Sequence, residues 1–520
     1  MKNTFVVALS ILMLQFSYGQ EKNLSNGTVF EGEPFIVVNP KNNQHLVVAW
    51  MGFVLGNNGR LSIKVKTSFD GGKNWSSAYA MPHMVPTYKS ADPSMAFDKS
   101  GNLFLCFIDY RESPDSGGVY VFKSKDGGLS WGSPVKAIDA YDDAPERPLD
   151  RPWLAVNENG DKLFITTKPA PWVPAPNRPY FISSVDSGLT WRTLRYIDST
   201  GFLVGNQIAE PMPAPAASGS LVYAVYPSYF PAESPYARFI IAKSDNAGNG
   251  FQYSVVLNGT TPANNDTAKT GYKLLINPAN SDHLAFLYLY RYNGGDIDVM
   301  LTESFDAGAN WVAPVRINDD PSGNGKLQDM IWGDFDKDGD LVISWRDRRN
   351  APGSGYLAAS EFYAAFRDKD SANFSPNFKL SDSLVAFNSI LLQSGNDFMC
   401  TDLTDDTISA VWGNTKDGSL DIWFVRLIAK TGQITSVSLL ESESANISVF
   451  PNPSNGIYFV KLNQQTPINH YQILNQEGKL IAEKNIDNYE FEIDLTNQHN
   501  GIYFLKVQAD KGNFTKKLVR

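Results

Sequence analysis

Short runs of apolar and β-branched residues recur along most of the chain at intervals of about 60 residues. Seven such runs are clear: 46–50 (LVVAW), 103–107 (LFLCF), 163–167 (LFITT), 221–225 (LVYAV), 284–288 (LAFLY), 341–345 (LVISW) and 407–412 (TISAVW). Their length and composition are typical of buried strands. The pattern therefore predicts a repeated all-β unit, because a fixed period of this size marks a repeat architecture.

A second repeat follows five of these runs. It is a phrase of the form Ser-x-Asp-x-Gly-x-x-Trp, in clean copies at 68–75, 124–131, 184–191 and 304–311 and in a worn copy at 244–251. The carboxylate of such a phrase accepts backbone N–H groups of its own turn, and the glycine permits a positive φ. The phrases resemble the Asp-boxes of sialidase-like (BNR) β-propellers. That resemblance implies a turn between strands three and four of each blade, with the Trp wedged between sheets.

Seven repeats predict seven four-stranded blades. A six-bladed ring remains the alternative, because sialidases, which these repeats resemble, have six blades. The last two repeats lack a clear Asp-box, and residues 356–366 are also compatible with a helix. The expected fold class is all-β: a seven-bladed (alternatively six-bladed) β-propeller at residues 20–434, followed by a small Ig-like β-sandwich.

The two ends of the chain differ from the repeats. Residues 1–19 combine Lys2, an apolar stretch and small residues at Ser17 and Gly19, which predicts a signal peptide. Residues 435–446 (TSVSLLESESAN) are polar and free of aromatic side chains, as expected of a linker. Residues 447–520 then give a short series of strand-like runs separated by Pro-Asn-Pro, Glu-Gly and Asn-Gly turns.

This last segment resembles a type IX secretion sorting domain. The motifs that carry the resemblance are 449–456 (VFPNPSNG), 472–479 (QILNQEGK), 501–505 (GIYFL) and the basic tail 516–520 (KKLVR). The resemblance implies an Ig-like domain that is handled by the type IX machinery. We therefore expect a protein that is secreted or displayed at the cell surface after export through the outer membrane.

Composition narrows the classes of partner. The net charge is −10 and no Lys/Arg cluster stands out, which argues against nucleic acid. After the first residues no apolar stretch is long enough for a membrane span. The two cysteines, Cys106 and Cys400, lie in strands of distant repeats, so we expect two buried free thiols and a monomer.

Acidic residues recur where the innermost strand of a repeat should begin. Asp92, Asp150 and Glu210 are the predicted catalytic carboxylates, each beside a proline-containing strand start like that of Glu33-Pro34. If these starts converge on the central channel, their charges raise one another's pKa or bind a cation. Alternatively, some of them only cap the strand entry and point sideways.

Aromatic and charged residues suited to sugar binding surround these positions in the repeat. The predicted substrate-binding residues are Glu33, Arg111, Arg151, Tyr290, Arg346 and Asp347. The resemblance to sialidases implies three arginines on the substrate carboxylate, a Tyr nucleophile primed by Glu, and an Asp acid. Yet the first sialidase arginine, expected in an Arg-Ile-Pro motif, is replaced here by Glu33-Pro34.

Two functions remain open at this point. The first is a secreted sialidase-like glycoside hydrolase acting on extracellular glycans, with carboxyl groups about 5–5.5 Å apart for retention or 6.5–9.5 Å for inversion. The second is a non-catalytic propeller that binds glycan or protein at the cell surface. Neither function requires a cofactor. His83 is a candidate base for a lyase-like variant of the first.

One segment has the alternating oxygen donors of a calcium loop. Asp334, Asp336, Asp338 and Asp340 surround Gly339, but Trp345 stands where an EF-hand has its bidentate Glu. Structural calcium is one interpretation, and a polar hairpin turn is the other.

Overall fold

The computed structural model describes the parts of the chain that carry the repeats and most of the C-terminal segment. These are residues 21–27, 29–54, 59–112, 115–140, 149–170, 178–205, 214–228, 230, 232–234, 237–259, 271–291, 296–387, 396–434, 447–462, 468–475, 479–488, 490–509 and 512–520. The predicted signal peptide (1–19) and linker (435–446) lie outside the described residues. The chain divides into two compact units, 1–434 and 435–520, which are considered separately.

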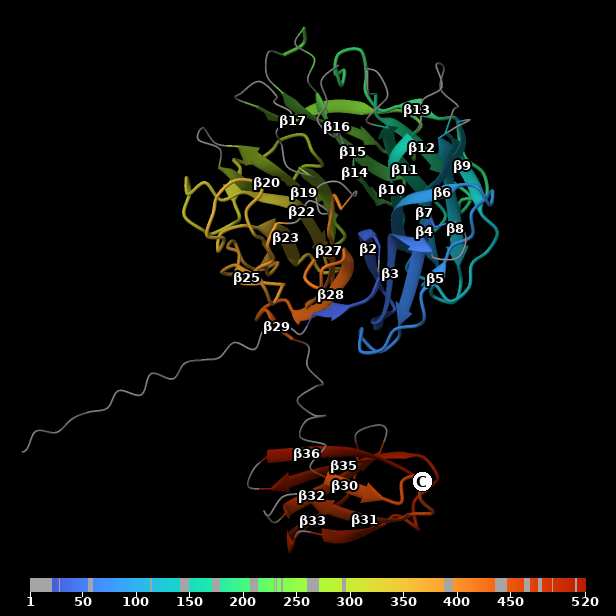
Figure 1. Cartoon of the computed structure of the whole chain (residues 1–520), viewed down its shortest axis with the longest axis vertical. Coiled ribbons are helices and arrows are strands. Elements are labelled where there is room, and N and C mark those ends of the chain that lie inside the picture. Colours follow the sequence, from blue (N-terminus) through green and yellow to red (C-terminus); the bar gives the residue numbers. More distant parts are fainter. Residues whose placement is uncertain are drawn as a thin grey trace, which may run out of the picture. The chain divides into compact units, whose positions relative to one another are not determined.

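The described part of the first unit forms seven antiparallel sheets arranged around a common centre (Figure 1). The first three are β2–β5 (Glu31–Asn39, Asn42–Val54, Arg60–Ser68, Tyr79–Ala80), β6–β9 (Lys89–Phe97, Leu103–Glu112, Asp115–Ser124, Val135–Asp139) and β10–β13 (Leu149–Val156, Leu163–Pro169, Tyr180–Ser184, Arg195–Tyr196).

The next three sheets are β14–β17 (Ala214–Ser218, Leu221–Ser228, Arg238–Ser244, Gln252–Asn258), β18–β21 (Tyr272–Asn277, Asn280–Arg291, Ile297–Ser304, Val315–Arg316) and β22–β25 (Gln328–Phe335, Leu341–Asp347, Glu361–Arg367, Phe378–Lys379). The seventh contains β26 (Cys400–Thr404), β27 (Thr407–Asn414), β28 (Asp421–Ile428), β29 (Gln433–Ile434) and the N-terminal β1 (Lys22–Asn23).

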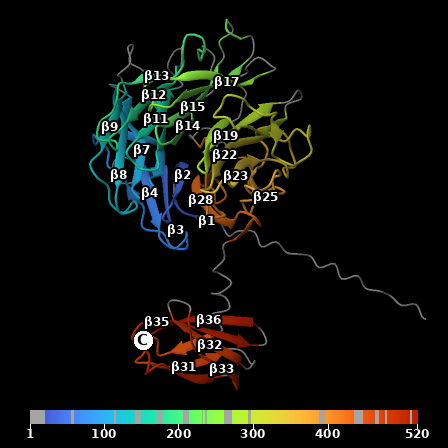
Figure 2. The ribbon, with the colours of Figure 1, turned by 180° about the vertical axis from the view of Figure 1, so that it is seen from behind.

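The sheets form a closed ring of blades. The innermost strands contact one another in the cyclic order β2, β6, β10, β14, β18, β22, β26 and back to β2. The two ends of the ring are joined by β1, which pairs with β28 so that Lys22 opposes Phe424 and Asn23 opposes Trp423. Leu24 N–H then donates to the Ile422 carbonyl at 2.7 Å. Figure 2 shows the same ring from behind.

The sequence repeats occupy equivalent positions in the sheets of the ring. All seven apolar runs lie in the second strand of a sheet, and the number of sheets among the described residues is the one expected from the repeats. Large side chains of these second strands, including Trp50, Trp345 and Trp412, are fully buried between blades. The segment that was also compatible with a helix contributes the strand β24, which begins at Glu361.

The repeated Ser-x-Asp phrase begins at the last residue of the third strand in five sheets. In the first copy, Ser68 Oγ donates to Asp70 Oδ1 at 2.9 Å and accepts the Gly72 N–H at 2.9 Å. Gly72 has a φ of +83°, and an added Cβ would lie 2.4 Å from the ring of Phe424. These contacts make the phrase a rigid, packed connection to the fourth strand.

The second unit is a small β-sandwich. A three-stranded sheet contains β30 (Ile447–Phe450), β31 (Ile457–Leu462) and β34 (Glu490–Asp494). A four-stranded sheet contains β32 (Ile468–Asn475), β33 (Leu480–Asn488), β35 (Ile502–Ala509) and β36 (Gly512–Val519). Its core is built from alternate residues of these strands, such as Tyr458, Val460, Ile473, Leu505 and Leu518.

Ring closure generates a stability prediction. Leu24 is 3% exposed and packs into the main core just after the closing strand. We expect Leu24→Ala to lower the free energy of unfolding by about 2–5 kcal/mol, since it leaves a cavity at the joint. Denaturant unfolding of the exported chain measures this loss. Val29→Ala, at a residue that is 49% exposed, is the matched control. Equal stability of the two variants would show that the joint does not hold the ring.

Candidate active site at the channel mouth

Four innermost strands carry an unusual corner near their start. Glu33, Asp92, Arg151 and Met330 have φ values of +52°, +57°, +52° and +52°. Each lies within a register shift between the first and second strands of its sheet. A non-glycine residue with positive φ is sparsely populated and persists only where surrounding contacts hold it. The same strained corner recurs around the ring, at the end of the central channel where the innermost strands begin. We call this end of the channel the channel mouth.

Three of these corners meet. The Arg151 N–H donates to Asp92 Oδ2 at 3.2 Å, which joins β10 to β6. The carboxyl groups of Asp92 and Glu33 are hydrogen-bonded to each other, which joins β6 to β2. The Arg151 guanidinium forms an ion pair with Asp397, which immediately precedes the innermost strand of the seventh sheet. Side chains from four blades thus converge on one small polar cluster.

The carboxyl pair in this cluster shares a proton. Burial, the neighbouring charge of Asp92 and the hydrogen bond to it raise the pKa of Glu33 well above its usual range, and Asp397 adds to the effect. Burial also raises the pKa of Asp92. Two carboxylates in contact cannot both be ionised at low cost, so one of them keeps a proton. Glu33 is 2% exposed, and its Oε2 has no hydrogen-bond partner among the described residues.

Aromatic rings close the channel beside the cluster. Trp153 and Trp332 lie 5.4 Å apart between ring centroids, and each also contacts Phe35 and Phe398. The Lys273 ammonium lies 3.7 Å from the Trp332 centroid, and burial lowers the pKa of this lysine to about 8. Trp153 and Trp332 are only 7% and 4% exposed, so these rings pack the interior of the ring of blades beside the cluster.

The predicted catalytic residue Asp150 is not equivalent to Asp92. Arg151 occupies the corner that matches Glu33 and Asp92, while Asp150 precedes it and pairs with Lys168 Nζ at 2.5 Å on the neighbouring strand. The reason is the register: in all three strands the residue directly before the proline forms the corner. Asp150 remains near enough to raise the pKa of Asp92 by its charge.

Arg346 holds the same place in the sixth sheet that Lys168 holds in the third. It binds Asp329 through Nε at 2.7 Å and Nη2 at 2.5 Å, and Arg348 Nη2 reaches the same carboxylate at 3.1 Å. Burial alone would raise the pKa of Asp329, but the two guanidinium groups outweigh it and hold that pKa at about 2. The Arg346 guanidinium thus forms an ion pair within its own blade.

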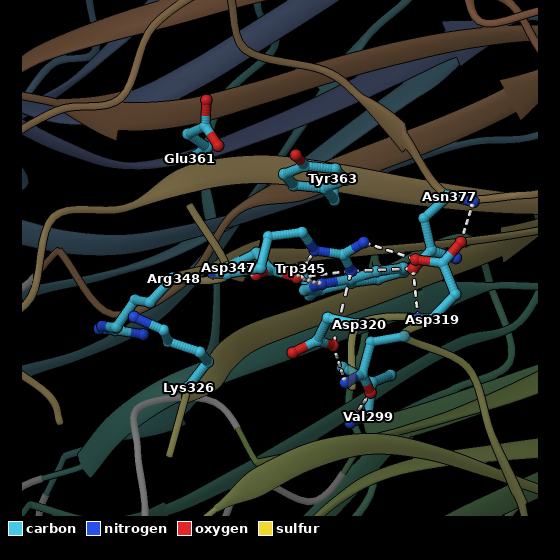
Figure 3. A network of polar contacts seen from close by, with 12 residues as sticks. Val299, Asp319, Asp320, Lys326, Trp345, Asp347, Arg348, Glu361, Tyr363 and Asn377 are labelled. Atoms are coloured by element: carbon cyan, nitrogen blue, oxygen red, sulfur yellow. Dashed lines mark hydrogen bonds and ion pairs between the residues drawn. The ribbon is translucent and has the colours of Figure 1, made fainter. Parts of the chain in front are cut away.

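Asp347 is also occupied by contacts within the protein (Figure 3). Its Oδ2 accepts Trp345 Nε1 at 2.7 Å and Arg349 Nη2 at 2.8 Å. The same arginine reaches Asn377 and stacks at 4.2 Å on the ring of Tyr363. Arg349 Nη1 also donates to Asp319 Oδ1 at 2.5 Å, in the connection from the fifth sheet to the sixth, so the Trp-Arg-Asp-Arg-Arg sequence forms a structural joint.

The other predicted site residues do not join the described cluster. Arg111 is exposed near the end of β7, and Tyr290 is half-buried against the main core on β19. Glu210 lies outside the described residues. Asp397 is not among the predicted site residues, because no proline follows it and its strand begins only at Cys400.

The four aspartates predicted to bind calcium separate into two groups. Asp336, Asp338 and Asp340 each place a carboxylate oxygen within 4.8 Å of the others, in the turn after β22. Asp334 lies instead on β22 itself and accepts the Leu403 N–H at 2.9 Å, beside Asp402. A backbone donor and a neighbouring strand therefore occupy Asp334, and any calcium ligands would come from the turn.

Cys106 and Cys400 are buried free thiols, as the sequence predicted. The described residues contain no helix long and apolar enough to cross a membrane.

Residues 448–520 match the family described as "Secretion system C-terminal sorting domain". The C-terminal sandwich is thus a type IX sorting domain, and the protein is exported to the cell surface or beyond. No curated protein matches the chain in sequence.

Several solved structures are similar to parts of this chain. A protein of unknown function from Dyadobacter fermentans is 16% identical, with a TM-score of 0.40 over 67% of this chain and 99% of that one. An alpha-L-arabinanase from Penicillium chrysogenum is 14% identical, with a TM-score of 0.40 over 62% and 94%. A variant of the NanB sialidase from Streptococcus pneumoniae is 10% identical, with a TM-score of 0.40 over 79% and 71%. Likeness at this level carries no argument about activity.

The carboxyl pair predicts a pH-dependent stability. The pKa of Glu33 is raised in the folded protein. Its contribution to the free energy of unfolding is therefore fully present below the pKa that Glu33 has in the unfolded chain, and it is lost as the pH rises through the pKa in the folded protein. Glu33→Gln keeps a donor toward Asp92 and carries no charge. We expect this variant to gain stability over the wild type as pH rises, by about 1.4 kcal/mol for each unit of pKa difference removed. Thermal unfolding of the two proteins at a series of values from about pH 4 to about pH 9 measures this difference in stability. A difference independent of pH would contradict the shared proton.

Calcium binding by the turn after β22 stays a prediction. We expect added Ca²⁺ to raise the Tm of EDTA-treated protein by a few degrees, because a ligand that binds only the folded state stabilises it. Asp338→Asn removes one carboxylate of the group and should abolish the shift. Asp370→Asn, at an exposed aspartate outside the group, is the control and should retain it. An unchanged Tm in the wild type would leave the turn as a polar hairpin.

Proposed function

We propose that the protein is a secreted glycoside hydrolase that cleaves neutral extracellular glycans at the channel mouth, with Glu33 as the proton donor. The observation that carries this proposal is the buried, hydrogen-bonded Glu33–Asp92 pair, in which burial and the neighbouring carboxyl group raise the pKa of Glu33 well above its usual range. A glycosidase needs such an acid to protonate the leaving oxygen of the glycosidic bond. Export by the type IX system puts the site in contact with extracellular material.

The second carboxylate of the reaction is Asp397. It is close enough to Glu33 to raise the pKa of that residue, and its ion pair with Arg151 stabilises the ionised form. An ionised carboxylate opposite the acid can stabilise the positive charge that develops on the sugar ring or activate water. Asp92, which touches Glu33 directly, then serves to hold the proton on Glu33 and to position it.

The charge of the site favours a neutral sugar. Two of the three arginines predicted to bind an anionic substrate are engaged with carboxylates, Arg151 with Asp397 and Arg346 with Asp329. The third, Arg111, is exposed and lies outside the cluster. Releasing either paired guanidinium would leave a buried aspartate unpaired, which costs several kcal/mol.

A non-catalytic propeller that binds glycans remains the second candidate. The burial of Glu33 and Asp397, which are 2% and 7% exposed, favours it, because a substrate would have to reach both carboxyl groups. In this case the cluster is a structural joint between blades.

Turnover of polysaccharides separates the two candidates. The purified chain is incubated with a panel of neutral and acidic polysaccharides, and released reducing ends are measured. We expect activity on a neutral glycan, and a loss of about 10²–10⁴-fold in kcat for Glu33→Gln with binding retained, since general acid catalysis is worth this much.

Two controls make the result specific. Asp397→Asn should lower kcat as well, whereas Glu158→Gln, at an exposed glutamate away from the mouth, should leave it unchanged. Binding of a glycan without turnover would favour the second candidate. Unchanged turnover by Glu33→Gln would overturn the assigned role of this residue.

A further inference from the structure

A serine, a histidine and an aspartate form a relay across the junction of the first two blades. Ser62 Oγ lies 2.8 Å from His83 Nε2, and His83 Nδ1 lies 2.8 Å from Asp109 Oδ1. Ser62 is on β4, His83 is in the connection from β5 to β6, and Asp109 is on β7. The order and the distances are those of a nucleophile, its general base and the carboxylate that orients the base.

The surroundings of Asp109 fix the orientation of the imidazole. Asp109 is fully buried and accepts the Ser90 hydroxyl at 2.9 Å on Oδ1 and the Met84 N–H at 2.6 Å on Oδ2. An ionised carboxylate accepts and does not donate, so it selects the tautomer with a proton on Nδ1. The unprotonated Nε2 then faces the Ser62 hydroxyl and can accept its proton.

We propose that Ser62 is the nucleophile of a second active site, which hydrolyses small carboxylic esters. Ser62 Oγ forms a bond to the ester carbonyl carbon while its proton passes to His83 Nε2. The C–O bond to the leaving alcohol then breaks, and the alcohol takes the proton from His83. Water attacks the acyl-Ser62 carbonyl with His83 again as base, which releases the carboxylic acid and restores the Ser62 hydroxyl.

Access to the relay restricts the substrate. The side chain of His83 is 14% exposed, while Ser62 is only 4% exposed. Reagents therefore approach from the imidazole side, and the acyl group that reaches Ser62 has to be small. An acetyl ester on a larger alcohol meets this requirement, because only the acyl end enters. This activity is independent of the proposed glycosidase, since it uses none of the residues of the channel mouth.

Covalent labelling tests the proposal on the intact chain. The exported protein is treated with a small alkyl fluorophosphonate, and the modified residue is located by peptide mass spectrometry. We expect labelling at Ser62 and hydrolysis of p-nitrophenyl acetate, both lost in Ser62→Ala. Locating the label on the wild-type chain does not depend on the folding of any variant.

The control variants distinguish catalysis from structure. Ser77→Ala, at an exposed serine, should keep both labelling and turnover. Asp109→Asn should lower kcat by about 10⁴-fold through the wrong tautomer, and Glu158→Gln, at an exposed glutamate outside both sites, should leave ester hydrolysis unchanged. Absence of label at Ser62 in folded wild-type protein, or ester hydrolysis that survives Ser62→Ala, would overturn the proposal and leave the relay as a joint between blades.

Discussion

The closing of the ring is the constraint on which the rest of the first unit depends. Strand β1 completes the last sheet by pairing with β28, so the first and last parts of the repeat region are held together. Once the ring is closed, the innermost strands contact one another in a cycle and their starts converge on one axis. An open row of blades would leave Glu33 of β2 far from Asp397 of the seventh sheet, and the polar cluster at the mouth would not exist.

The convergence of the innermost strands brings acidic side chains close together. Their mutual repulsion is reduced in two ways. Asp397 and Asp329 are matched with guanidinium groups, Arg151 and Arg346 respectively. Glu33 and Asp92 are hydrogen-bonded to each other and share a proton, although the charge of Arg151 lowers the pKa of both. The first arrangement produces stable ion pairs, while the second produces a buried acid whose pKa is raised well above its usual range. The chemistry of the mouth follows from this difference.

The repeat architecture could be predicted from the sequence because each blade carries its own local signals. The turn that begins at Ser68 depends only on contacts within a few residues, so its motif and its place were predictable. The site was less predictable. Asp150 looked equivalent to Asp92, but the corner is set by the residue before the proline, which makes Arg151 the equivalent. Aligning the three prolines would have shown this.

Contacts that depend on the pairing of strands and on the packing of neighbouring blades were beyond the reach of sequence reasoning. Neither the ion pair of Arg346 with Asp329 nor the contact of His83 with Ser62 has a sequence signature, because each depends on register between strands. His83 was noticed as a candidate base, yet its two neighbours in the relay come from different blades. The spacing of residues along the chain does not predict such contacts, because they are fixed by strand register and by the packing of neighbouring blades.

Infrared spectroscopy of the carboxyl groups tests the central claim most directly. A protonated carboxylic acid has a C=O stretching band that is distinct from the bands of a carboxylate. The wild-type-minus-Glu33→Gln difference spectrum at neutral pH should contain such an acid band, because the variant lacks the Glu33 carboxyl group. A wild-type spectrum without an acid band that depends on Glu33 would contradict the shared proton, and with it the assignment of the channel mouth as an acid site.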